Sequence, residues 1–318
     1  MMRYAAQRVL SMLPTLLILV FLVVLFARLA PTDVIDVILA GSASDDVSRK
    51  ELEDNLGINK PLPQTYIEYV AGVAHADLGK SLLSRREVSE MIMERLNITI
   101  ELALMGLAVG WAFGATIGVV SAVRQDGPID YLLRAFALIG LTIPNFALAT
   151  AVVILPAIYW NWSPPLIYTH FSKDPIAHFS QFIVPACVLG FALMGASMRF
   201  TRTQMLEVLR QDYIRTARVK GLRETRVITR HALKNAMLPV VSVLGLQVAT
   251  VFSGAVILET IFALPGMGRL LLDSVQQKDW PVVQGVTIVV GAWVMLVNLL
   301  IDLSYGFFDP RVKIGGRS

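Results

Sequence analysis

The sequence has 318 residues, of which 55% are hydrophobic and 16% are charged, with a mean hydropathy of +0.62 and a formal net charge of +4. Ordinary soluble domains carry about 25% charged residues, so this composition excludes that class and predicts an all-α membrane protein. A transmembrane β-barrel is excluded too, because the apolar residues form unbroken blocks instead of short segments of alternating polarity.

Six stretches of the sequence are long and apolar enough to cross a membrane as helices. A helix rises about 1.5 Å per residue, so roughly 20 apolar residues cross the hydrocarbon core. The third stretch exceeds that length and contains Pro144 and Pro156, so we expect it to kink, to tilt or to end in the interface. In chain order, the predicted spans are residues 9–30, 98–123, 132–160, 179–198, 238–258 and 282–301.

The distribution of Lys and Arg predicts the orientation of these spans. Ten of the 28 Lys and Arg residues lie within 199–234, and others flank the first span, the second and third spans and the chain's end. The short loops on the opposite side hold only Lys173, Arg269 and Lys278. Both termini and the segment 199–237 are therefore predicted to be cytoplasmic. The positive charge follows from this topology, so no nucleic acid partner is expected.

The segment 31–97 is predicted to be an external loop. It carries twelve Asp and Glu against seven Lys and Arg, which indicates an acidic, partly folded region with helices over 47–56 and around 66–73. A further helix over 88–96 places Val88, Met91, Ile92 and Leu96 on one apolar stripe. We expect this helix to pack against neighbouring spans at the outer mouth; the alternative is a docking surface for an external partner.

The sequence offers no enzymatic site. Gly79-Lys80-Ser81 resembles the end of a phosphate-binding loop, but Ala74 stands where that pattern requires a glycine. His170 and His178 share one loop without carboxylate or cysteine companions at ligand spacing, so no metal site is predicted. The chain is expected to have no catalytic activity and no cofactor of its own.

Intramembrane charge is sparse, which bears on the type of transport. Glu101 and Asp302 lie at the ends of predicted spans, whereas a secondary carrier would place ionisable groups near the midplane. The segment 199–237 instead predicts a cytoplasmic helix pair with Gly221 as its hinge. Leu222, Val227 and Ile228 are expected to anchor the second helix in a partner's groove.

The residues of this segment resemble the EAA motif of ABC importer permeases. Residues 212–222 and 230–236 are similar to the dipeptide and oligopeptide branch of that family. Arg215, Thr216 and Ala217 occupy the motif's triplet, and Gly221 occupies its glycine. Further stretches that resemble the family are 13–15, 28–31, 55–57, 77–81, 95–102, 143–146, 259–262 and 265–269. The large loop after the first span resembles that of the first of two permease subunits.

The resemblance implies a single permease domain over 1–318, with six helices and the type I ABC importer architecture, in a bacterial inner membrane. It implies four partners besides the lipid bilayer: a second permease subunit, two ABC ATPase subunits that bind ATP and Mg, and an external substrate-binding protein. The implied substrates are dipeptides or oligopeptides, with a nickel or glutathione importer as the alternative. A self-contained channel or secondary carrier is the alternative from another class.

The resemblance and the residue pattern together select two sets of candidate residues. The basic members of the first set either pair with acids on the ATPase or only set the topology. The expected ATPase-docking residues are Arg215, Thr216, Ala217, Arg218, Lys220, Gly221, Leu222, Arg223, Glu224, Arg226 and His231. The expected outer gate, predicted from position alone, comprises Met91, Ile92, Leu96, Pro265, Gly266, Met267 and Gly268.

Overall fold

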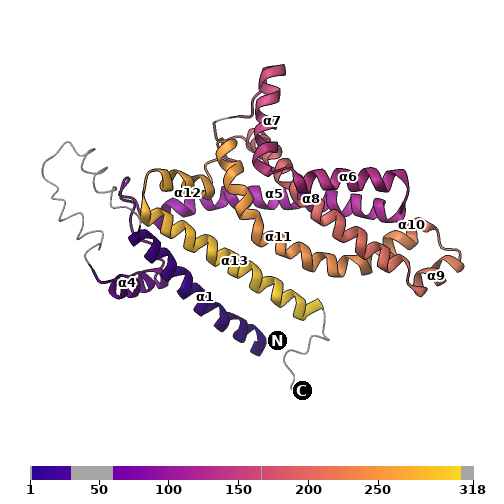
Figure 1. Cartoon of the computed structure of the whole chain (residues 1–318), viewed down its shortest axis with the longest axis horizontal. Coiled ribbons are helices and arrows are strands. Elements are labelled where there is room, and N and C mark those ends of the chain that lie inside the picture. Colours follow the sequence, from indigo (N-terminus) through magenta and orange to yellow (C-terminus); the bar gives the residue numbers. More distant parts are fainter. Residues whose placement is uncertain (1, 30–59, 166, 309–318) are drawn as a thin grey trace. The chain divides into compact units, whose positions relative to one another are not determined.

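The computed structural model describes residues 2–29, 60–165 and 167–308, and every regular element in these ranges is helical (Figure 1). The helix expected over 47–56 and the family-like stretch 55–57 lie outside the described residues. The chain divides into two compact units, Met1–Asn97 with Arg269–Leu299 and Ile98–Gly268 with Leu300–Ser318.

The helices that can cross a membrane lie where the apolar blocks predict them. Four helical segments are long and apolar enough by themselves, and two bent helix pairs pass the same test together. The described residues thus hold four spans, or up to six if each bent pair is one span. The single segments are Leu10–Leu29, Val88–Val123, Pro175–Leu209 and Trp280–Ile301, and the pairs are Pro128–Thr142 with Asn145–Trp160 and Glu224–Met237 with Pro239–Phe252.

The first unit packs helix α4 (Leu62–Ala74) against helix α1 (Met2–Leu29). The Tyr66 hydroxyl donates a hydrogen bond to the Leu17 carbonyl oxygen over 3.2 Å, and its ring meets Phe21 edge to face. Ile288 of α13 (Trp280–Phe308) joins this contact as a buried neighbour of Val20, Val23 and Val24. The helix predicted around 66–73 is confirmed.

The segment that resembled a phosphate-binding loop is a tight turn in the first unit. Gly79 has a φ of +83°, and Lys80 pairs with Glu87 in an isolated antiparallel bridge. The Ser81 hydroxyl donates to the buried Asp279 carboxylate over 2.5 Å, just before α13 begins. These contacts give the turn a structural role.

The second unit contains α5 (Val88–Val123) from Ile98 onward, with α6 (Pro128–Thr142), α7 (Asn145–Trp160), α8 (Pro175–Leu209) and α11 (Leu233–Ile261). The helix expected over 88–96 is continuous with the span that follows, because no glycine or proline interrupts residues 88–105. The third apolar stretch breaks at Ile143 and Pro144, where α6 and α7 meet at 97°. Proline disfavours helical backbone in the residue before it, so the predicted kink is a full break.

Glycines at every fourth position let α5 and α8 approach closely. A methyl group added at Gly110 would lie 2.7 Å from the Leu193 Cβ, and one added at Gly114 would lie 2.5 Å from the Ser197 Cβ. Gly106 and Gly118 have equally close neighbours on α8. Small residues at this spacing allow helix backbones to pack directly in a membrane. This repeat is visible in the sequence, but our sequence analysis did not use it.

Candidate functional site

The segment between α8 and α11 folds as a helix, a turn and a second helix. Helix α9 (Asp212–Val219) is followed by the short α10 (Glu224–Arg226) and by a π-helical turn, η1 (Val227–Ala232), which continues into α11 (Figure 1). In η1 the Leu233 N–H bonds to the Ile228 carbonyl oxygen, five residues earlier. π-helical turns are rare and are often found at functional sites.

Gly221 forms the turn between the two helices. Its φ is +74°, and a Cβ added there would meet no atom within 4 Å, so the backbone conformation alone favours glycine. The Gly221 N–H bonds to the Arg218 carbonyl oxygen and the Leu222 N–H to the Ala217 carbonyl oxygen, which is the Schellman arrangement at a helix end. A turn thus lies at Gly221, where the sequence predicts the hinge of the helix pair, and movement at this hinge stays a prediction.

The inner face of α9 rests on a buried apolar cluster, which we name the loop cluster. Ile214 and Ala217, three residues apart, supply this face. Leu222 and Ile228 pack against the cluster from its edge. The expectation that Val227 enters a partner's groove is wrong, because its side chain is fully buried inside the chain's own cluster. The buried members of the loop cluster are Ala122, Met205, Ile214, Ala217, Val227, Ala232 and Ala236.

The outer face of α9 and the turn is basic and exposed. Two apolar side chains are exposed on the same helix, Val219 at 82% and Tyr213 at 43%. Sequence analysis did not select them, although they stand out of register with Ile214 and Ala217. Among the docking candidates, His231 and Leu222 are half-buried and Ala217 is buried. The exposed candidates are Arg215, Thr216, Arg218, Lys220, Gly221, Arg223, Glu224 and Arg226.

Two polar contacts stabilise the loop from within. Arg218 donates to Glu224 through Nη2 over 2.8 Å and through Nε over 3.1 Å, so these two charges neutralise each other across the turn. The Asn235 side-chain amide donates to the Tyr213 hydroxyl over 2.8 Å and ties α9 to the start of α11. Arg218 is thus already paired within the chain.

The segment predicted as part of an outer gate encloses a buried carboxylate. Glu259, near the end of α11, is fully buried and accepts hydrogen bonds from the Thr99 hydroxyl over 2.6 Å and from the Gly268 N–H over 2.7 Å. The Thr99 oxygen in turn accepts from the Met267 N–H over 2.8 Å. A methyl group at Gly266 would lie 2.2 Å from the Glu259 carboxyl carbon. Only glycine fits there without displacing the carboxylate.

The gate candidates are divided between the two units. Met91, Ile92 and Leu96 lie in the first unit, where Ile92 is buried and the other two are half-buried. Residues 265–268 lie in the second unit, and all but the half-buried Pro265 are buried. Their role as an outer gate stays a prediction.

His178 and Glu101 form a pair that the sequence analysis did not predict. The His178 ring is nearly buried, with Nε2 2.9 Å from a Glu101 carboxylate oxygen and Nδ1 2.8 Å from the Thr169 carbonyl oxygen. A carbonyl oxygen only accepts, so Nδ1 carries a hydrogen. Burial, with the Glu101 charge as a second cause, raises the pKa of the neighbouring Tyr168 phenol. Within the described ranges, no group of three or more His, Cys, Asp and Glu side chains could hold a metal ion.

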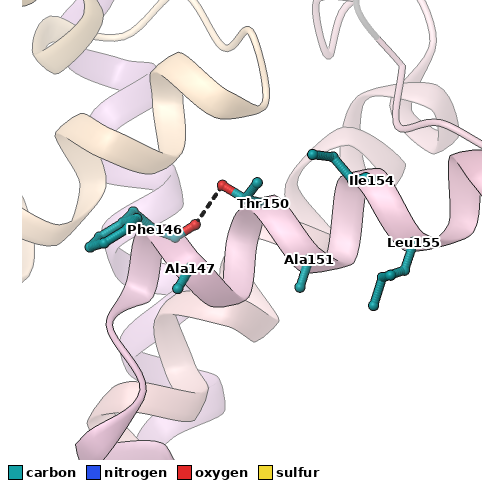
Figure 2. Close-up of a pocket in the computed structure, with 6 residues that line it drawn as sticks. All are labelled: Phe146, Ala147, Thr150, Ala151, Ile154 and Leu155. Atoms are coloured by element: carbon teal, nitrogen blue, oxygen red, sulfur yellow. Dashed lines mark hydrogen bonds between the residues drawn. The ribbon is translucent and has the colours of Figure 1, made fainter.

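A shallow apolar hollow lies along one face of α7. Figure 2 shows the lining side chains spaced along this helix, and the Thr150 hydroxyl donates back to the Phe146 carbonyl oxygen over 2.7 Å. The hydroxyl is therefore satisfied, and the face suits lipid or another apolar helix better than a charged ligand. The lining residues are Phe146, Ala147, Thr150, Ala151, Ile154 and Leu155.

The sequence matches two family models that together cover most of the chain. The model described as "Binding-protein-dependent transport system inner membrane component" matches residues 114–314. The model for the N-terminal part of these membrane components matches residues 1–103. The chain belongs to this family. Binding-protein-dependent inner membrane components are transport proteins rather than enzymes, and the resemblance predicted from the sequence is confirmed.

Relatives of this family align along nearly the whole chain. The dipeptide transport system permease protein DppB of Escherichia coli strain K12 is 38% identical, over 98% of this chain and 99% of the relative. A putative peptide permease protein of Brucella suis biovar 1 is 38% identical, over 99% and 100%. The glutathione transport system permease protein GsiC of Pectobacterium atrosepticum is 36% identical, over 98% and 99%.

A solved structure has the same fold. The crystal structure of an amino acid ABC transporter with histidines matches with a TM-score of 0.52 and 13% sequence identity, over 70% of this chain and 94% of that chain. At this identity the match speaks for the helical permease fold alone. The family match and the apolar helices, and not this structural match, identify the chain as a component of the inner membrane.

Proposed function

We propose that this chain is one permease subunit of an ATP-driven importer of dipeptides or oligopeptides. It forms half of the pathway beside a second permease subunit, with six spans and both termini in the cytoplasm. The Lys and Arg distribution supports this orientation, and the lengths of the apolar helices and bent pairs support the spans. The names of the aligned relatives support a peptide substrate. A glutathione importer is the second candidate, because one such permease aligns nearly as well.

The loop 199–237 couples the chain to two ABC ATPase subunits in this proposal. The observation that carries it is the two-sided α9, which packs Ile214 and Ala217 inward on the loop cluster and turns basic side chains outward. A helix with one buried face moves with the helices beneath it, while its exposed face remains open to a partner. The exposed Val219 and Tyr213 add apolar contact area to the docking surface.

ATP and Mg bind to the ATPase subunits, and an external binding protein delivers the peptide. Closure of the ATPases on ATP moves α9 and shifts the spans between inward-open and outward-open packings. Arg215, Arg223 and Arg226 are the basic residues proposed to meet acids on the ATPase. Arg218 contributes indirectly, because it is paired with Glu224.

The test is uptake of a radiolabelled dipeptide, dialanine, by proteoliposomes that contain the complete complex. We expect uptake to require enclosed ATP, and we expect Arg215→Glu with Arg223→Glu to lower both ATPase co-purification and uptake by about tenfold. Lys173→Glu, an exposed charge reversal in the loop before α8, is the matched control and leaves both unchanged. Full uptake and co-purification in the double variant would rule out this docking surface. Uptake of glutathione but not of dialanine would select the second candidate.

A further inference from the structure

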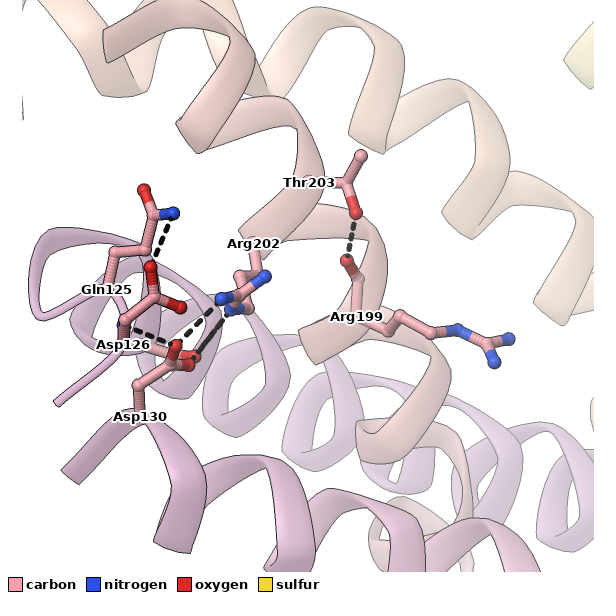
Figure 3. Close-up of polar contacts among 7 residues, drawn as sticks. Gln125, Asp126, Asp130, Arg199, Arg202 and Thr203 are labelled. Atoms are coloured by element: carbon pink, nitrogen blue, oxygen red, sulfur yellow. Dashed lines mark hydrogen bonds and ion pairs between the residues drawn. The ribbon is translucent and has the colours of Figure 1, made fainter. Parts of the chain in front are cut away.

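Asp130, in the first turn of α6, carries a fully buried carboxylate that accepts four hydrogen bonds. Arg202 of α8 donates through Nε to Oδ1 over 2.9 Å and through Nη2 to Oδ2 over 2.7 Å. The Ser121 hydroxyl also donates to Oδ1, and the Asp126 N–H donates to Oδ2 over 3.0 Å. Figure 3 shows Arg202 reaching across to Asp130. Each carboxylate oxygen is therefore fully satisfied.

These contacts join the last turn of α5 and the first turn of α6 to α8, two turns before α8 ends. Ser121 lies in the last turn of α5, Asp126 in the connecting turn, Asp130 at the start of α6 and Arg202 in α8. A bidentate arginine–carboxylate pair is directional, so it fixes the relative orientation of the helices that carry the two residues. A lysine in place of Arg202 would keep the positive charge, but its ammonium group cannot make the bidentate contact that fixes this orientation.

The ion pair lies directly beside the loop cluster. Ala122, next to Ser121, and Met205, one turn beyond Arg202, are buried members of that cluster and pack with Ile214 and Ala217 of α9. In the described part of the chain, the cluster's members come from α5, α8 and residues 209–236, and α6 supplies none. The Asp130–Arg202 pair is thus the polar connection from α6 to the helix ends that support α9.

The far end of α6 leads to the broken span. Along its length α6 packs on α8, where a methyl group at Gly195 would lie 2.6 Å from the Ala137 carbonyl oxygen. The helix ends at Thr142, and after the break α7 leaves at 97°. Closely packed elements move as one body, so a shift of the α6 start is passed to the break and to α7.

We infer that Asp130 and Arg202 are positioning residues that pass the movement of α9 to α6 and α7 during transport. This inference rests on the proposed function, in which α9 docks on the ATPases. The pair locks the ends of α5, α6 and α8 into one body beneath α9. ATP-driven displacement of α9 then displaces α6, and with it the broken span, instead of only bending the loop.

The choice of substitution can separate an effect on the stability of the permease from an effect on the movement passed from α9 to α6. Removing one partner leaves an uncompensated buried charge, so single variants such as Arg202→Met risk misfolding. Replacing both partners with apolar residues of similar volume is often neutral for stability. The double variant Asp130→Val with Arg202→Met removes both charges together with the directional contact, and co-purification of all subunits checks that it folds. Arg134→Met is the matched control, since Arg134 is exposed on α6 one turn after Asp130 and lies outside the loop 199–237.

The experiment measures dialanine uptake and ATP hydrolysis by the complete reconstituted complex. For the double variant, we expect normal co-purification of all subunits, ATP hydrolysis close to wild type, and uptake per ATP lowered by about tenfold. Arg202→Lys lowers the same ratio to an intermediate value, and Arg134→Met leaves it unchanged. An unchanged ratio in the double variant, whether both activities persist or fall together, overturns the inference.

The wild-type complex distinguishes failure of this inference from failure of the proposed function. A wild-type complex that neither retains ATPases nor imports dialanine contradicts the proposed function and, with it, the inference. A working wild-type complex with an equally coupled double variant contradicts the inference alone.

The distance between α6 and the start of α9 is a second measurement, and a loss of stability alone would not make it depend on nucleotide. Spin labels at Tyr131 in α6 and Gln211 before α9, both exposed, are placed in a Cys187→Ser background. In the wild type, we expect one narrow distance that is the same without nucleotide and with trapped ATP. In the double variant, we expect the distance to change with nucleotide. A wild-type distance that changes with nucleotide contradicts the rigid connection.

Discussion

Helices α9 and α11 end in the same way but in different surroundings. In both, the residue after the C-cap has a positive φ, +74° at Gly221 and +55° at Ala263. In both, the next N–H bonds back to the carbonyl oxygen five residues earlier, from Leu222 to Ala217 and from Leu264 to Glu259. The difference is that one position is a glycine in open space, whereas the other is an alanine between the buried Phe262 and Leu264.

Two different causes therefore maintain the same backbone conformation. At Gly221 the residue type removes the steric penalty, so the turn needs no help from its neighbours. At Ala263 the left-handed conformation is strained, and the buried network around Glu259 holds it in place. Substitutions of exposed residues in the loop after α9 are therefore expected to change the free energy of unfolding little. Substitutions of buried residues in the loop after α11 are expected to lower it strongly.

The largest effect is expected for Gly266→Ala. The added methyl group would overlap the Glu259 carboxylate, so the free energy of unfolding of the permease in detergent should fall by about 2–3 kcal/mol. Glu259→Ala also destabilises, because the Thr99 hydroxyl and the Gly268 N–H lose their acceptor. The double variant Gly266→Ala with Glu259→Ala should lose less free energy of unfolding than the two single variants added together, since the clash disappears with the carboxylate. Strict additivity would show that the two residues do not meet.

A pair of opposite effects is expected for the two turn residues. Gly221→Ala should lower the free energy of unfolding by about 1 kcal/mol, because the new Cβ disfavours positive φ and gains no contact. Ala263→Gly should raise it by about 0.5 kcal/mol, because relief of strain exceeds the added entropy of the unfolded chain. Gly221→Asn is the control and should cost less than Gly221→Ala, since asparagine tolerates this conformation. Equal signs for the two main variants would contradict the comparison.

The smallest effect is expected for Arg218→Gln in the loop after α9. Its partner Glu224 is about half exposed, and exposed ion pairs contribute about 0–1 kcal/mol. The thermal unfolding midpoint should therefore move little, and Glu224→Gln should behave the same way. A large destabilisation by either variant would mean that the exposed pair, and not Gly221 with the loop cluster, maintains the turn.

The parts of the fold that depend on local sequence could be predicted. Unbroken apolar blocks locate the spans, Pro144 marks the break in the third stretch, and Gly221 marks the turn of the candidate site. Each signal acts within a few residues, through helix length, a missing N–H or a missing Cβ. The direction in which Val227 faces was not predictable in this way, because an apolar residue suits the chain's own core as well as a partner's groove.

Contacts between distant residues could not be predicted from one sequence. Asp130 and Arg202 are 72 residues apart, and Glu101 and His178 are 77 apart. Neither pair carries a local pattern, because a single charge in a helix reveals nothing of the helix that packs beside it. The buried role of Glu259 was hidden for the same reason, since Thr99 lies 160 residues away.

The glycines of α5 set a limit on how the helices can rearrange. At four successive turns, the space between α5 and α8 is too narrow for even one methyl group. The α8 side of this seam is formed by Leu189, Leu193 and Ser197, whose side chains lie directly against the α5 glycines, so neither helix can slide along the other without a clash. We therefore expect the two helices to move as one rigid body in the proposed transport cycle. Alternation between inward and outward access is then expected along other helix borders.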